Sequence, residues 1–152
     1  MNIMPINSIV RWFKKAVPEP TERNFNTQMG CHVEEFVEML ETLEVVEHRA
    51  DEYNHIISMM NTFANNLKAG KYGIHVVDAV GFLDSVCDQV VTGVGAATMS
   101  DMDVESALIN VAVSNDSKFD SKGEPIFDEN GKIIKGPNYI KPTLDRFVKK
   151  VA

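Results

Sequence analysis

The sequence predicts an all-α fold, a bundle of about four to six helices with a small β-hairpin near the C-terminus. Apolar residues recur at spacings of three and four over most of the chain, which is the period of an amphipathic helix. Residues 116–138 differ, because they are polar and rich in glycine and proline. We expect one domain over residues 1–152, a length that is typical of a domain and sufficient to bury a core.

Three helices are predicted in the first half of the chain. Residues 1–20 form an amphipathic helix and its linker, and Pro18 and Pro20 end the helix. We expect this helix to pack on the core rather than on a membrane, since an acidic chain follows it. Residues 26–49 have the pattern of one long helix, and residues 51–68 form a second that the glycines of "KAGKYG" terminate.

The second half of the chain is predicted to contain two further helices and an insertion. One helix runs from about Ile74 to Met99, and "SDMDVESALINVAVSN" gives a short helix with a capping serine or aspartate. Residues 116–138 form a loop insertion that contains the β-hairpin, whose turn is Asn130-Gly131. The stretch "KPTLDRFVKK" is expected to close the chain as a short helix.

Composition excludes several classes of protein. A net charge of −7 argues against a protein that binds a nucleic acid polymer or an anionic membrane. Cys31 and Cys87 have no zinc-site spacing, and free cysteines suit a reducing cytoplasm. We find no signal peptide and no transmembrane segment, and we therefore expect a cytoplasmic protein. The sequence also contains no P-loop and no HExxH motif.

Four glutamates lie opposite the apolar side of the helix predicted over residues 26–49. They are Glu34, Glu35, Glu38 and Glu41. Taken alone, the cluster is more typical of a solvated acidic face than of a site. However, like charges at these spacings repel, and no lysine or arginine lies between residues 24 and 48 to relieve them.

Two aspartates on the 74–99 helix favour a metal site. Asp84 falls within the apolar face of this helix and Asp88 at its edge, where a carboxylate is unfavourable unless it is compensated. No lysine or arginine lies between Gly73 and Met102. A hard divalent cation, Mg²⁺ or alternatively Mn²⁺, would satisfy both helices at once.

The order of these motifs resembles the all-α nucleoside triphosphate pyrophosphohydrolases, a superfamily that includes MazG-type enzymes, dimeric dUTPases and phosphoribosyl-ATP pyrophosphohydrolase. Their pattern is EExxE on one helix and ExxD on another. "EEFVE" supplies Glu34, Glu35 and Glu38, and "DSVCD" supplies Asp88. The resemblance extends over about residues 20–142. Within the superfamily, the sequence is similar in pattern to a phage-associated branch whose members are often labelled phosphoribosyl-ATP pyrophosphohydrolase-like.

The sequence departs from the family at the glutamate of ExxD, where it has Ser85. The nearest acidic residue is Asp84, one position earlier. Either Asp84 replaces the missing ligand, or the metal site is reduced. The resemblance implies a metal set of Glu35, Glu38, Asp84 and Asp88, and catalytic roles for Glu34, Glu35 and Glu38. Glu34 would bind metal or activate the attacking water.

Substrate-binding residues are also implied. "SNDSKF" resembles the N-x-K-F segment of MazG-type proteins, one residue longer, so Asn115 and Lys118 would contact the phosphates. Lys135 would attract the phosphate tail of the substrate by its positive charge. Asn24 and Gln28 precede the acidic residues and would reach the base or sugar, although capping or surface roles explain both equally well.

The resemblance therefore implies Mg²⁺-dependent hydrolysis of a nucleoside or deoxynucleoside triphosphate to the monophosphate and pyrophosphate. It also implies a homodimer or homotetramer, in the host cytoplasm if the protein is phage-encoded. Two alternatives stay open: a phosphoribosyl-ATP pyrophosphohydrolase, and a non-catalytic helical binding or regulatory protein. The Ser85 departure supports the second alternative.

Overall fold

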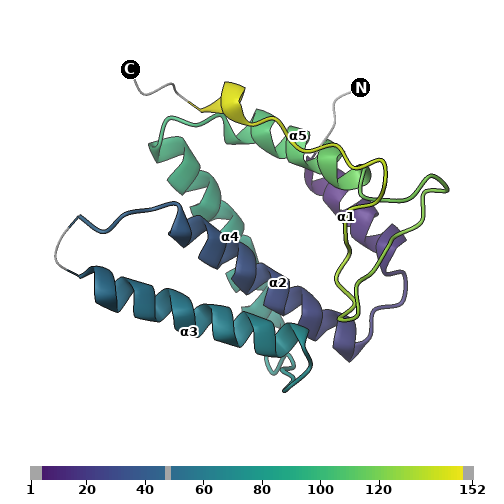
Figure 1. Ribbon diagram of the computed structural model, residues 1–152, viewed down its shortest axis with the longest axis horizontal. Helices are drawn as coiled ribbons and strands as arrows, with labels where there is room; N and C mark the ends of the chain where they lie inside the picture. Colours follow the sequence, from purple (N-terminus) through teal and green to yellow (C-terminus); the bar gives the residue numbers. More distant parts are fainter. Residues whose placement is uncertain (1–4, 47–48, 149–152) are drawn as a thin grey trace. The chain divides into compact units, whose positions relative to one another are not determined.

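The computed structural model describes residues 5–46 and 49–148, and its fold is all-α as predicted (Figure 1). Five α-helices and one short 3₁₀ helix lie in these residues, which contain no β-strand. The chain divides into two compact units. Unit 1 comprises Met1–Pro18, Val76–Ile126 and Ile134–Ala152, and unit 2 comprises Glu19–His75 and Phe127–Ile133. The expected single domain stays a prediction.

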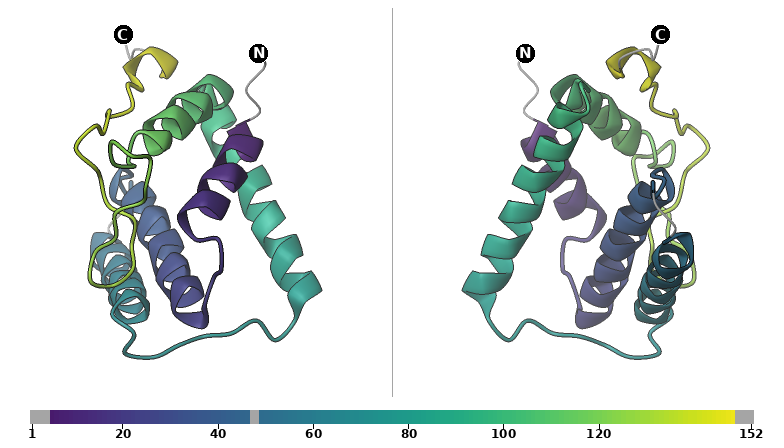
Figure 2. Two further views of the ribbon diagram at one scale, coloured as in Figure 1. Left: turned by 90° about the vertical axis from the view of Figure 1, so that its right-hand side faces the viewer. Right: turned by 90° about the vertical axis from the view of Figure 1, so that its left-hand side faces the viewer.

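Unit 2 is built on a helical hairpin. Its helices α2 (Glu22–Glu41) and α3 (Ala50–Lys68) lie side by side (Figures 1 and 2). A capping box begins α2: the Thr21 hydroxyl accepts the N–H of Asn24, and the Asn24 side chain accepts the N–H of Thr21. These two bonds satisfy backbone groups that the helix itself leaves unpaired.

The core of unit 2 lies between α2 and α3. Val37, Ala64 and Leu67 are at most 1% exposed. Gly30 permits a close approach of the two helices, because a Cβ atom added there would lie 2.6 Å from Cγ of Lys68 and 2.8 Å from the carbonyl oxygen of Ala64. The amphipathic pattern of the two helices therefore becomes a tight interface, with a close approach near the end of α3.

Unit 1 contains α1 (Pro5–Ala16), α4 (Ala79–Met99), α5 (Val104–Asp116) and the 3₁₀ helix η1 (Asp145–Phe147). Its most buried aromatic pair joins α1 to the segment that follows α5.

The ring of Trp12 stacks on Phe119 with centroids 5.7 Å apart, and both residues are 8% exposed. Trp12 also donates its indole N–H to the carbonyl of Asn115 at 2.8 Å. The first helix thus packs on the core of unit 1, as the sequence predicted.

Helix boundaries differ from the prediction at three places. The helix expected over residues 26–49 begins at Glu22 and ends at Glu41; residues 42–46 are not helical, and residues 47–48 lie outside the described part of the chain. The helix expected from Ile74 begins at Ala79, because the side chain of Asp78 caps it by accepting the N–H of Gly81. The expected C-terminal helix is reduced to η1, and residues 149–152 are not described.

The predicted β-hairpin is not confirmed, because residues 125–134 form no strand and contain only an isolated antiparallel bridge, between Phe127 and Ile133. The two arms bond each other next to this bridge: the N–H of Ile134 donates to the carbonyl of Ile126 at 2.8 Å, and the N–H of Asp128 donates to the carbonyl of Lys132 at 2.9 Å. The Asn-Gly turn is nevertheless present, and Gly131 has the positive φ of 77° that such a turn requires.

The expectation of a packed apolar face around Asp84 is also wrong for the chain as described. No residue of α4 is buried, and Asp84, Ser85 and Asp88 are all exposed. The apolar face predicted from the sequence is present but uncovered: Leu83 is 64% exposed and Val91 is 66% exposed. Within the described residues, no helix combines the length and apolar character needed to cross a bilayer.

Candidate functional site

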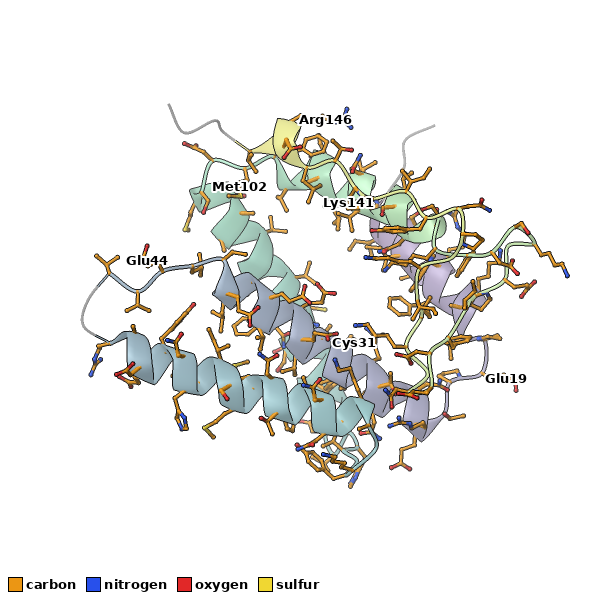
Figure 3. The ribbon with its side chains drawn as sticks, viewed as in Figure 1. Glu19, Cys31, Glu44, Met102, Lys141 and Arg146 are labelled. Carbon is orange, nitrogen blue, oxygen red and sulfur yellow. The ribbon has the colours of Figure 1, made fainter. Side chains whose placement is uncertain are left out.

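The acidic motif lies in the second half of α2, where helical spacing separates its three glutamates into two groups. Glu35 and Glu38 are one turn apart and exposed. Neither forms a hydrogen bond or ion pair with another described residue. Glu34 is partly buried, with 22% of its side chain exposed. Cys31, one turn earlier on α2, is labelled in Figure 3.

Glu34 differs from the other carboxylates of the motif because two lysines bind it. Lys68, the last residue of α3, donates from Nζ to Oε1 at 2.5 Å. Lys132 donates from Nζ to Oε2, also at 2.5 Å. The two lysine side chains are 13% and 38% exposed. Both carboxylate oxygens of Glu34 are therefore occupied by ammonium groups of the same unit.

Burial and charge act in opposite directions on this cluster. Burial alone would raise the pKa of Glu34, but hydrogen bonds from Lys132 and Lys68 lower it below its ordinary value. Burial alone would lower the pKa of Lys132, but its hydrogen bond with Glu34 raises it. Burial raises the pKa of the Cys31 thiol, which makes this cysteine a poor nucleophile at neutral pH. The lowered pKa of Glu34 and the raised pKa of Lys132 both favour the charged forms of this pair.

A turn in residues 127–133 fixes the position of Lys132. Oδ1 of Asp128 accepts the backbone N–H groups of Asn130 and Lys132, both at 2.9 Å. Thr27, which is buried on α2, donates its hydroxyl to the carbonyl of Asn130 at 2.8 Å. The turn is therefore joined to α2 at Thr27 and again at Glu34.

Sequence reasoning missed both lysines. It noted that no cation lies near Glu34 along the chain, which is correct, but the counter-ions come from positions 34 and 98 residues away. The sequence contains only one indirect signal, the lysine that directly follows the Asn-Gly turn. Nothing in the local pattern connects that turn to α2.

The second pair of acidic residues, Asp84 and Asp88, lies one turn apart on α4 in unit 1. This pair and the glutamates of the EExxE motif thus belong to different units. Among the described residues, no three histidine, cysteine, aspartate or glutamate side chains gather as metal ligands. A metal set drawn from Glu35, Glu38, Asp84 and Asp88 is composed of exposed oxygen ligands, the donors that Mg²⁺ prefers, and stays a prediction.

The predicted substrate-binding residues include a helix cap, exposed side chains and two lysines that lie beside aromatic rings. Asn24 belongs to the capping box of α2, and Gln28 is exposed. Lys135 is exposed, with Nζ 4.9 Å from the ring centre of Tyr139. Lys118 is half-buried, with Nζ 5.8 Å from the ring centre of Trp12. Asn115 accepts the Trp12 indole N–H through its backbone, which leaves its amide side chain outside this bond.

A cavity of about 410 Å³ lies in unit 1 beside these last two residues. Asp116 and Ser117, between Asn115 and Lys118 in the sequence, line it together with Trp12 and Phe119. Its charged walls balance: Arg11 and Lys15 face Asp116 and Asp120, and Arg11 pairs with Asp116 at 3.7 Å. The cavity therefore has no excess positive charge of its own with which to select an anion.

Comparison with solved structures shows a related fold. The chain is similar to a protein from Exiguobacterium sp. 255-15 described as a "putative NTP pyrophosphohydrolase", with a TM-score of 0.58 and 16% sequence identity over 93% of this chain and 90% of that one. No protein-family model matches the sequence, and no curated protein matches it. At this identity the likeness establishes the all-α fold alone.

Proposed function

We propose that the chain is a nucleoside triphosphate pyrophosphohydrolase, which releases the nucleoside monophosphate and pyrophosphate and depends on Mg²⁺ or Mn²⁺. One observation supports this most: an EExxE motif lies on a surface helix of a chain whose fold matches, over nearly its whole length, that of a protein described by this activity. Fold alone would not justify the assignment, but the carboxylates that match the family motif add chemistry to it.

Glu35, Glu38, Asp84 and Asp88 would hold the metal. Glu35 and Glu38 fit this role because both are exposed oxygen ligands that no lysine binds by a hydrogen bond or ion pair. The ion would neutralise the charge of the phosphates, which an acidic protein otherwise repels. Ser85 interrupts the family pattern, and Asp84 is proposed to replace the missing ligand.

The remaining residues would position the substrate. Lys118 and Lys135 would attract the phosphate tail by their positive charge, and the side-chain amide of Asn115 would donate a hydrogen bond to it. Attack by water at a phosphate needs positioning and charge neutralisation more than covalent catalysis. In this proposal Glu34 is less suited to activate that water than its neighbours, because two ammonium groups already occupy its oxygens.

A panel of ribo- and deoxyribonucleoside triphosphates, with phosphoribosyl-ATP as a separate arm, tests the proposal through Mg²⁺-dependent release of pyrophosphate. We expect Glu38→Gln and Asp88→Asn to reduce the rate about 100-fold, because each removes a metal ligand. Glu41→Gln is the matched control, since Glu41 lies on the same helix outside the motif. Absence of pyrophosphate with every substrate, with either metal, would contradict the proposal.

A non-catalytic protein on the same fold is the alternative, and Ser85 is the observation that favours it. Calorimetric titration of the same variants with Mg²⁺ and Mn²⁺ distinguishes the two. An enzyme of the proposed kind has a metal site that disappears in Asp88→Asn, whereas an inert module shows no such site in the parent chain.

We also propose a homodimer or homotetramer. The uncovered apolar face of α4 supports it, because contiguous exposed apolar surface of this kind typically marks an interface. A second copy of the chain is the partner that the superfamily resemblance implies.

A further inference from the structure

Two lysines of unit 2 converge on one carboxylate from separate parts of the chain. Lys68 ends α3, and Lys132 follows the Asn130-Gly131 turn. Each Nζ lies 2.5 Å from a different oxygen of Glu34. Two ammonium groups therefore share one carboxylate, and neither of them is bonded to the neighbouring Glu35.

Both lysines are held in place before any ligand arrives. A Cβ atom at position 30 would lie 2.6 Å from Cγ of Lys68, so it is the missing side chain of Gly30 that leaves room for the stem of this lysine against α2. The backbone carbonyl of Lys68 is also bonded, by the guanidinium of Arg23. Preorganised donors of this kind bind an anion with a smaller entropic penalty than freely rotating surface lysines.

The position of Lys132 is equally constrained. Asp128 accepts its backbone N–H, and Thr27 binds the neighbouring carbonyl of Asn130. The two ammonium groups therefore bracket one small group with two acceptor oxygens, which is at present the carboxylate of Glu34. A phosphate oxygen pair has the same chemistry, and each ammonium has three N–H donors, of which Glu34 is bonded to one.

We propose that Lys68 and Lys132 form an anion site for a phosphate group, in which Glu34 holds the two ammonium groups in position and competes with the anion for them. The ligand class is phosphate or pyrophosphate. The identification of this anion as the phosphate tail or pyrophosphate product of a nucleotide rests on the proposed function. Glu34 directly precedes the proposed metal ligand Glu35 on α2, so an anion held here would lie near that end of the proposed metal set.

The sign of one mutational effect separates this proposal from a purely structural role of the ion pairs. The full chain is titrated calorimetrically with inorganic pyrophosphate, and separately with orthophosphate, in the presence of EDTA. We expect Lys68→Gln and Lys132→Gln each to weaken binding about tenfold, since each removes a charge-assisted hydrogen bond. Glu34→Gln should instead strengthen binding about fivefold, because it removes the competing carboxylate.

Three controls accompany the titration. Lys71→Gln removes an exposed lysine three residues after Lys68, beyond the end of α3, and should change nothing. Lys132→Arg keeps the charge and should retain most of the affinity. A nucleoside without phosphate should not compete with pyrophosphate, and a nucleoside triphosphate that competes better than free pyrophosphate would identify the anion as part of a nucleotide.

The proposal is overturned if the parent chain binds no pyrophosphate at millimolar concentration, if Lys68→Gln/Lys132→Gln binds as the parent does, or if folded Glu34→Gln fails to gain affinity. Folding of each variant is checked by its thermal unfolding midpoint, and Lys132→Arg tests the site even if Glu34→Gln unfolds. The titration contains neither metal nor turnover, so its result is independent of the nucleotide panel. A chain that binds pyrophosphate but hydrolyses nothing would retain this site and lose the proposed activity.

Discussion

Glu34 illustrates how a single residue of a motif acquires a different role from its neighbours. It precedes Glu35 directly and belongs to the same EExxE pattern, yet it faces α3 and the 127–133 turn while Glu35 and Glu38 remain exposed. The acidic motif could be found from sequence because it is local. The distinction between its members could not, because the two lysines that create it lie 34 and 98 residues away.

Asp103 provides a residue-scale prediction about pH. Its side chain caps α5 by accepting the N–H of Ser106 at 3.1 Å, and hydrogen bonding to Ser106 lowers the pKa of Asp103 below its ordinary value of 3.8. A lowered pKa in the folded chain means that the cap stabilises fully above about pH 3.8 and that this contribution is lost as pH falls through the folded pKa.

We therefore expect Asp103→Ala to lower the thermal unfolding midpoint by a few degrees at pH 7, and the difference from the parent to shrink below pH 3.8. Circular dichroism melts at several pH values measure it. Asp103→Asn is the matched control, because asparagine caps a helix about as well and does not titrate. A deficit of Asp103→Ala that stays the same down to pH 2 would show that the carboxylate charge contributes nothing.

At the scale of elements, the period of the apolar residues predicted every helix, whereas the boundaries depended on particular polar side chains. The start of α4 moved from Ile74 to Ala79 because Asp78 caps it. The predicted hairpin did not develop into strands, because its two arms meet in an isolated bridge between Phe127 and Ile133, and a strand needs a longer ladder of such pairs. Periodicity reports which face of an element is apolar, but it does not reveal competing hydrogen bonds.

The interface of α2 with α3 leads to a prediction with a definite sign. Gly30→Ala should destabilise the chain by about 1–3 kcal/mol, because the new methyl group would overlap Lys68 and the backbone of Ala64. Alanine otherwise favours a helix over glycine by about 1 kcal/mol. Urea unfolding at pH 7 measures the change in the free energy of unfolding.

Gly93→Ala is the matched control for this substitution. Gly93 lies inside α4, and a Cβ atom added there meets nothing within 4 Å. Here only helix propensity acts, so we expect stabilisation by about 0.5–1 kcal/mol. If both variants are stabilised, the close approach at Gly30 is not a constraint on the hairpin.

At the scale of the whole molecule, α4 is the helix whose apolar residues are left exposed to solvent. It carries Asp84 and Asp88 together with a row of exposed apolar residues, and it contains no buried residue. The sequence predicted this apolar face and attributed it to packing within the chain. Pattern alone cannot name the partner of an amphipathic helix, since the same apolar period serves a core and an interface equally.

If a second copy covers α4, the parent chain should elute as a dimer or tetramer in size-exclusion chromatography with light scattering. Leu83→Glu/Val91→Glu should shift it toward the monomer, because each new carboxylate would be buried without a partner. Val77→Glu is the control, an exposed valine that precedes α4 and should leave the mass unchanged. A parent chain that is monomeric at high micromolar concentration would contradict the homo-oligomer. A double variant that keeps the parent's mass would place the interface on another surface.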